Sequence, residues 1–212
     1  MPKYVSFQHA CQDNTTRICK VKGCELHRKA VSGYCNYHTS RLTLHGDPEH
    51  RCIRYSEYKG KADQVKAILQ KNISHPGVKQ GLSFFKDWLS DPEHPRRPQK
   101  QVDFVFNIRD MGVSERDLLS DATALFMMKM ENHYKIRSQR HFIYQLGHTF
   151  ILHAPLGGVI PRGTTKREYG QHIYDNLYKL FLNITASIRE KLREDEERKN
   201  AFMKPLDMST EE

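Results

Sequence analysis

The sequence predicts a mainly α-helical protein in which a small cysteine- and histidine-containing module precedes a helical domain with a long C-terminal helix. The helical domain is indicated by apolar residues that recur at steps of three and four along much of the chain. The module is indicated by three cysteines and a histidine at short spacings beside glycines. We therefore divide the 212 residues into a module (1–52), a helical domain (53–200) and a flexible tail (201–212).

The module has the spacing C-x4-C-x10-C-x2-H, which is formed by Cys19, Cys24, Cys35 and His38. Gly23 precedes the second cysteine and Gly33 stands close before the third, which suits tight chain reversals. Three thiolates and one imidazole form a tetrahedral ligand set that is typical of structural Zn²⁺. The sequence therefore predicts a zinc ion clamped by two close pairs of ligands, with a ten-residue finger between them.

Two alternatives for the cysteines remain open. Cys11 and Cys52 bring the count to five, so a secreted disulfide scaffold would leave one thiol over. No apolar leader follows Met1 and no apolar run is long enough to span a bilayer, so we expect an intracellular, cytoplasmic protein without a membrane partner. In the second alternative, His27, His45, Cys11 or Cys52 replaces one of the four ligands.

Helices are expected on both sides of a basic linker. The first runs from Asn36 to His45, with a ligand in its first turn and Gly46-Asp47-Pro48 at its end. Two more are marked by apolar residues at helical spacing: Val65, Ile68 and Leu69, then Val78, Leu82, Phe85, Trp88 and Leu89. Trp88 is expected in the core. Prolines and arginines near residues 91–100 predict an extended basic linker.

The segment from Val102 to Ile108 alternates as a strand would, and a short β-hairpin is one reading of it; helix is the other. If it is helical, residues 111–114 become the turn of a helix-turn-helix, with Ser114 as the N-cap of a helix from Glu115 to Met130. That second helix is rich in leucine, phenylalanine and methionine, which favours a place in the core over a place in a DNA groove.

Two further helices complete the domain. The first has an apolar face of Ile136, Ile143, Leu146 and Phe150, while its remaining surface carries Lys135, Arg137, Arg140, His141 and His148 and could lie along phosphates. The second begins with a capping box of Thr165 and Glu168 and continues to Leu192, with charged residues expected to fray from Glu194. Its apolar stripe predicts core packing, with a homodimer seam as the alternative.

The run Cys19-Lys-Val-Lys-Gly-Cys24, followed by Gly33-Tyr-Cys-Asn-Tyr-His38, Arg41 and Gly46-Asp-Pro48, resembles a small zinc-binding module of bacteriophage proteins. Such modules often precede an HNH nuclease domain or occur in phage DNA-binding proteins. The resemblance implies zinc and a phage or mobile-element protein acting in a host cell, and it covers only this part of the chain. The histidine pair and asparagine of an HNH core do not follow, so the resemblance does not imply nuclease activity.

The net charge of +9 is unevenly distributed. Residues 1–52 carry 8 basic and 4 acidic side chains, residues 94–167 carry 12 and 6, and the last 45 residues carry 7 and 10. A positive field of this kind predicts a polyanion partner, with DNA favoured over RNA. The residues predicted to contact phosphates are Lys20, Lys22, Arg28, Lys29, Arg41, Arg96, Arg97, Arg137, Arg140, Arg162 and Arg167.

Catalytic motifs are weak in this sequence. Residues 158–165 have the spacing of a phosphate-binding loop, but Thr164 stands where the loop requires lysine. Glu57-Tyr58-Lys59 could end a metal-dependent nuclease motif, although no partner acid on a strand accompanies it. The sequence thus favours a zinc-containing, non-enzymatic nucleic-acid-binding protein. The alternatives are a protein–protein adaptor acting on host or phage machinery and a divergent metal-dependent nuclease.

Overall fold

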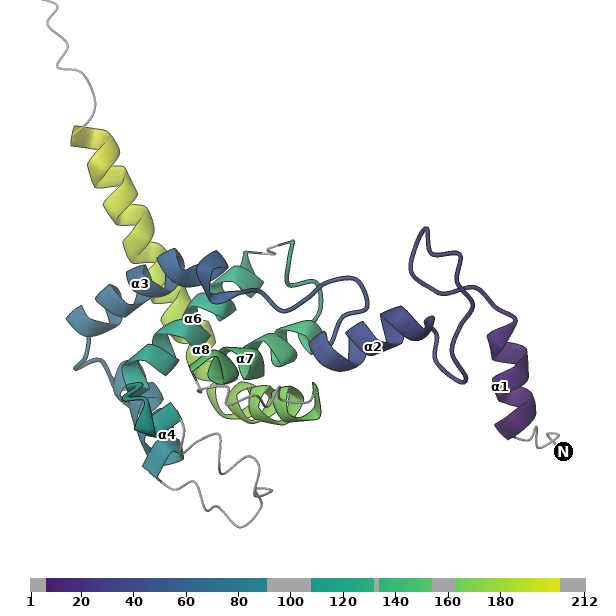
Figure 1. Ribbon diagram of the computed structural model, residues 1–212. Helices are drawn as coiled ribbons and strands as arrows, with labels where there is room; N and C mark the ends of the chain where they lie inside the picture. Colours follow the sequence, from purple (N-terminus) through teal and green to yellow (C-terminus); the bar gives the residue numbers. More distant parts are fainter. Residues whose placement is uncertain (1–6, 91–107, 132–133, 154–162, 203–212) are drawn as a thin grey trace, which may run out of the picture.

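The structure is a computed structural model, and it describes residues 7–90, 108–131, 134–153 and 163–202. Over these residues it is mainly helical, with a cysteine and histidine cluster near the N-terminal end and a long C-terminal helix, as predicted (Figure 1). The helices are α1 (Phe7–Thr15), α2 (Asn36–His45), α3 (Tyr55–Lys71), α4 (Pro76–Ser90), α6 (Glu115–Met130), α7 (Gln139–His153) and α8 (Gly163–Phe202). No strand forms within these ranges, where an isolated bridge joins Ile18 and His27.

Helix α6 lies at the centre of the helical body. Every residue from Leu118 to Met128 is buried, and the helix packs against α3, α4, α7 and α8. A helix buried all round is a core helix, so the place in the core that the sequence favoured is confirmed, and the helix-turn-helix alternative with α6 in a DNA groove does not hold. Its predicted start is confirmed, because the Ser114 side chain accepts a hydrogen bond from the Asp117 backbone at 3.2 Å.

The segment ahead of α6 is described only in part. Residues 108–110 are helical, and Ile108 is buried in the core. The rest of the predicted strand or helix, residues 102–107, lies outside the described residues, as does the basic linker of residues 91–100.

Helices α7 and α8 form the most extensive contact in the described body. They approach so closely because two glycines face the opposite backbone. A Cβ at Gly170 would lie 1.7 Å from the carbonyl oxygen of Ile143, and one at Gly147 would lie 1.8 Å from that of Lys166. No side chain larger than hydrogen fits at either position without moving a helix.

Aromatic rings fill the adjoining core. Trp88 of α4 packs edge-on against Phe150 of α7 and Tyr169 of α8, with ring centroids 4.8 Å and 5.5 Å apart. Its side chain is almost fully buried, so the prediction that Trp88 belongs to the core is confirmed.

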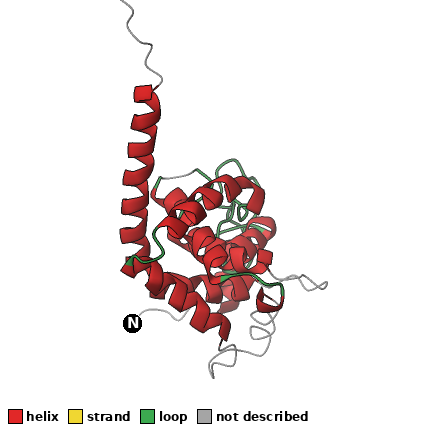
Figure 2. Ribbon diagram, turned by 90° about the vertical axis from the view of Figure 1, so that its left-hand side faces the viewer, coloured by secondary structure: helices red, strands yellow, loops and turns green. Residues whose placement is uncertain are grey.

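Helix α8 differs from the prediction at both ends, and Figure 2 shows its length along one side of the body. It begins at Gly163, so Thr165 lies inside the helix and does not cap it. At the other end it continues through the charged residues after Glu194 to Phe202, where fraying was expected. Arginine, glutamate and lysine are strong helix formers, and the Arg193–Glu197 ion pair at 3.7 Å adds support. The tail beyond residue 202 lies outside the described residues.

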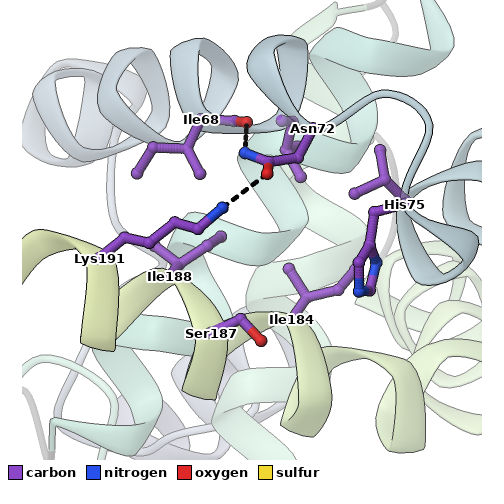
Figure 3. A pocket seen from close by; sticks show the side chains of 9 residues that line it. Ile68, Asn72, His75, Ile184, Ser187, Ile188 and Lys191 are labelled. Carbon is purple, nitrogen blue, oxygen red and sulfur yellow. Dashed lines mark hydrogen bonds between the residues drawn. The ribbon is translucent and has the colours of Figure 1, made fainter.

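A small apolar pocket lies between α3 and α8 (Figure 3). It holds about 40 Å³, which is space for little more than a water molecule. The polar groups at its rim form hydrogen bonds with one another. The Asn72 side chain donates to the carbonyl of Ile68 at 2.7 Å and accepts from Lys191 Nζ at 2.6 Å. We regard it as a packing gap between the helices.

The module is fixed to the body through the end of α2. Gly46 caps α2 with φ of 75°, a left-handed conformation that suits glycine, and a Cβ there would lie 2.6 Å from the Tyr144 ring of α7. Gly163 at the start of α8 meets α2 even more closely, since a Cβ there would lie 1.8 Å from the Thr43 carbonyl oxygen. These contacts set the direction in which the module leaves the body.

Hydrogen bonds secure the segment between α2 and α3. The backbone N–H of Ile53 donates to the Gln145 side chain at 2.5 Å, and that side chain donates back to the Ile53 carbonyl at 3.2 Å. His141 Nε2 lies 3.3 Å from the Arg51 carbonyl oxygen. His141 is fully buried, so its predicted place on a solvent-facing cationic surface is wrong, and its ring serves this junction.

The junction contains two histidines that are held neutral. Burial, and then the positive charge of Lys166, lowers the pKa of His45 and of His148 from 6.5 to about 4. Lys166 is itself buried and donates to the Leu44 carbonyl at 3.3 Å. Folding favours the neutral form of both histidines, so the folded state binds fewer protons than the unfolded state between pH 6.5 and pH 4. The free energy of unfolding is therefore highest above pH 6.5 and decreases as the pH falls towards 4.

Acidification from pH 7 to pH 5 is therefore expected to lower the free energy of unfolding by about 1–2 kcal/mol through His148, and by less through the half-buried His45, because solvent screens its charge. Denaturant titrations followed by the fluorescence of Trp88, the single tryptophan, measure this in the body. A His148→Gln variant should show a smaller loss between the two pH values. An equal loss in both chains would contradict the assignment.

None of the described helices combines the length and apolar character needed to cross a membrane.

Candidate metal centre and basic surface

The four predicted ligands lie together at one end of the molecule. Their ligand atoms, one from each of Cys19, Cys24, Cys35 and His38, all lie within 4.8 Å of one another. The Nδ1 atom of His38 is 3.4 Å from Cys19 Sγ and 3.3 Å from Cys35 Sγ, and the sulfurs of Cys24 and Cys35 are 3.9 Å apart. This Cys₃His cluster can hold a metal ion.

These separations match a tetrahedral site. With metal–sulfur bonds of about 2.3 Å and a metal–nitrogen bond of about 2.0 Å, tetrahedral angles place two sulfurs about 3.8 Å apart and sulfur and nitrogen about 3.5 Å apart. Free thiols and an imidazole have no reason to converge at these distances, since S–H groups form only weak hydrogen bonds.

Short turns bring the first two ligands together. Gly23 adopts φ of 78°, which lets the chain reverse immediately before Cys24, and the N–H of Cys24 donates to the Val21 carbonyl at 3.1 Å. The N–H of Cys19 donates to the Leu26 carbonyl at 2.9 Å, which closes the loop around both sulfurs.

The second pair comes from the start of α2. Cys35 has extended backbone angles and occupies the N-cap of the helix, while His38 lies in its first turn, as predicted. The two side chains therefore point to the same end of α2. Cys35 is almost fully buried, although the module around it contains little apolar core.

The environment of Cys19 favours its thiolate. Burial raises the pKa of this thiol, but hydrogen bonds from the backbones of Cys35 and Val21, and from the side chains of His38 and Cys24, outweigh burial and lower it to about 7. A thiolate is the form that binds a metal ion, so the backbone prepares this sulfur for coordination.

The alternative ligands lie elsewhere. His45 and Cys52 meet at the junction with the body, where the Cys52 N–H lies 3.4 Å from His45 Nδ1 and burial raises the Cys52 pKa to about 11. Cys11 belongs to α1, and His27 is exposed on the finger. Among the described residues, no other group of cysteine, histidine, aspartate or glutamate side chains brings its ligand atoms together in this way.

Among the predicted phosphate contacts, six residues are exposed: Lys20, Lys22, Lys29, Arg137, Arg140 and Arg167. The three lysines belong to the segment between Cys19 and Cys35, which holds three of the four ligands. None of the three forms an ion pair with a described residue, which leaves their charge available to solvent and ligands.

Arg28 has internal partners. Its Nε donates to the Ile18 carbonyl at 2.8 Å and its guanidinium donates to the Asn14 side chain at 3.3 Å. These bonds join the finger to the end of α1, so Arg28 supports the module whether or not it also meets a phosphate.

Arg41 and Arg137 are engaged through Glu49. Arg41 donates to the Glu49 carbonyl at 2.9 Å, and Arg137 pairs with the Glu49 carboxylate at 3.1 Å. The other predicted contacts, Arg96, Arg97 and Arg162, lie outside the described residues.

Two further basic residues lie near this surface: Lys135, which the sequence placed on a cationic face that could lie along phosphates, and Arg51, which the sequence did not single out. Both interact with Glu57 at the start of α3. These ion pairs also weigh against the nuclease motif, because the Glu57 carboxylate that would bind a catalytic metal ion is paired with two cations. The sequence contains no local signal for the pair of Glu57 and Lys135, because 78 residues separate them.

No match was found when the chain was compared with protein-family models, with curated proteins and with solved structures.

Proposed function

We propose that this chain is a zinc-containing nucleic-acid-binding protein without enzymatic activity, acting on DNA and encoded by a phage or mobile element. Zinc suits the site because three thiolates and one imidazole in a closed tetrahedron form a structural zinc ligand set. The phage assignment rests on the resemblance of the module alone.

The observation that carries the nucleic-acid proposal is the combination of a metal-organised module with exposed lysines on it. Figure 1 shows the finger and α1 standing away from the helical body, joined to it through α2. Lys20, Lys22 and Lys29 lie on this projecting part, where a polyanion can approach without meeting the body. The contacts of α2 with α7 and α8 hold the module in a defined direction.

A double Lys22→Gln, Lys29→Gln variant is expected to bind duplex DNA about tenfold more weakly and to show a salt dependence that is shallower by about two in log–log slope. The measurement is a salt-titrated binding assay with duplex DNA, single-stranded DNA and RNA. Lys79→Gln with Lys86→Gln is the matched control, because both lysines are exposed on α4 away from the module. Equal losses in both pairs would mean that the module does not make the contact.

A second candidate function is a protein–protein adaptor. The module exposes several apolar side chains, among them Ile18, Leu26 and Val31, which are 57%, 59% and 62% exposed. Exposed apolar residues near one another can form a protein interface. The same assay separates the two functions, since an adaptor has no salt-dependent affinity for any of the three nucleic acids.

A further inference from the structure

A polar cleft opens where the module meets the body. It has a volume of about 370 Å³ and lies between the end of α2, the segment before α3, the first turn of α3 and the residues before α7. Its charged walls are formed by Arg41, Arg51, Lys135, Glu49 and Glu57, and Tyr134 lies at its edge.

Glu57 acts as an internal anion in this cleft. Its carboxylate accepts hydrogen bonds from Lys135 and from the Arg54 N–H at 2.8 Å, and it lies 3.2 Å from the Arg51 guanidinium. The hydrogen bond from Lys135, and then that from Arg54, lowers the pKa of Glu57 to about 2. The carboxylate thus sits where two side-chain cations and the positive end of α3 converge.

Arg41 of α2 also lines the cleft. Its terminal nitrogens are taken by Glu49 and Tyr37, but its Nε is buried and has no hydrogen-bond partner among the described residues. A buried guanidinium N–H without an acceptor is costly, and an oxygen-rich ligand in the cleft would supply one.

From this geometry we infer that the cleft binds a phosphate group of the nucleic acid, and that Glu57 occupies the same cations when the cleft is empty. The inference rests on the proposed function. It extends the contact surface from the finger to Lys135 and to Arg51, and the charge pattern did not single out Arg51. A phosphate oxygen takes the place of the carboxylate oxygens, and Glu57 therefore weakens binding.

Glu57→Gln tests this competition. Glutamine is also accepted at the third position of a capping box, so the variant keeps the cap of α3 and removes only the charge. Affinity for nucleic acid should rise about fivefold, and the salt dependence should steepen by about one in log–log slope, because Arg51 and Lys135 become available to phosphate. The matched control is Glu190→Gln on α8, which makes the same change in net charge at an exposed site far along the chain.

A second change ties the gain to the cleft. Lys135→Gln, introduced together with Glu57→Gln, should return the affinity to the wild-type level or below. Trp88 fluorescence checks that all three chains are fully folded under the conditions of the binding assay.

The outcomes separate this inference from the proposed function. If the wild-type chain binds nucleic acid and Glu57→Gln gains no more than Glu190→Gln, the cleft assignment is wrong and the proposed function stands. If Lys135→Gln leaves the gain intact, the cleft assignment is also wrong. If no chain binds any nucleic acid, both are overturned.

Discussion

Removal of the metal ion is expected to unfold the module and to leave the helical body folded. The hydrophobic core contains only residues from Ile53 onward, so the body does not depend on the module for its apolar burial. Among residues 7–45, the described part of the module up to the end of α2, only the ligands Cys19 and Cys35 are buried. A structural zinc ion contributes about 10–16 kcal/mol of binding free energy at neutral pH, and nothing else in the module can replace it.

Amide hydrogen exchange before and after chelation measures this effect. Amides in residues 17–35 should lose all protection, while those of α6 and α7 should keep theirs. Cys35→Ser should reproduce the result without chelator and should abolish stoichiometric metal in elemental analysis. Cys11→Ser is the control, because Cys11 belongs to α1 and lies outside the cluster. A folded chain without stoichiometric metal would contradict the site.

The ligand cluster could be predicted from sequence because its geometry is local. Cys19 and Cys24 are held by one short turn, and Cys35 and His38 by the first turn of α2, so residue type and spacing contain nearly all the information. The helices were predictable for the same reason. Helices α4 and α8 each pack one face against the core, and this leaves apolar residues at steps of three and four in the local sequence.

The junction could not be predicted in this way. Gln145 and Ile53 exchange two hydrogen bonds across 92 residues, and no local pattern marks either residue. His141 was assigned to a solvent-facing surface because histidine is polar, whereas the α2–α3 segment covers it and accepts its hydrogen bond. Long-range packing decided both positions, and single-sequence periodicity contains no information about it.

Gly170→Ala is expected to disrupt the crossing of α7 and α8. The added methyl group would lie 1.7 Å from the Ile143 carbonyl oxygen and 2.9 Å from the Gly147 nitrogen, and both are backbone atoms that cannot rotate away. One of the helices must shift, and overpacking of this kind costs about 3 kcal/mol or more. For a chain of this length the midpoint of thermal unfolding should fall by about 6–12 °C.

Gly60→Ala distinguishes this clash from a general intolerance of substitution. Gly60 lies in α3 with nothing within 4 Å of the position of a Cβ, so alanine should raise the free energy of unfolding by about 0.5–1 kcal/mol through its better helix propensity. Calorimetry should therefore show a lower free energy of unfolding for Gly170→Ala and a higher one for Gly60→Ala. A mild effect of Gly170→Ala would mean that α7 and α8 cross less tightly.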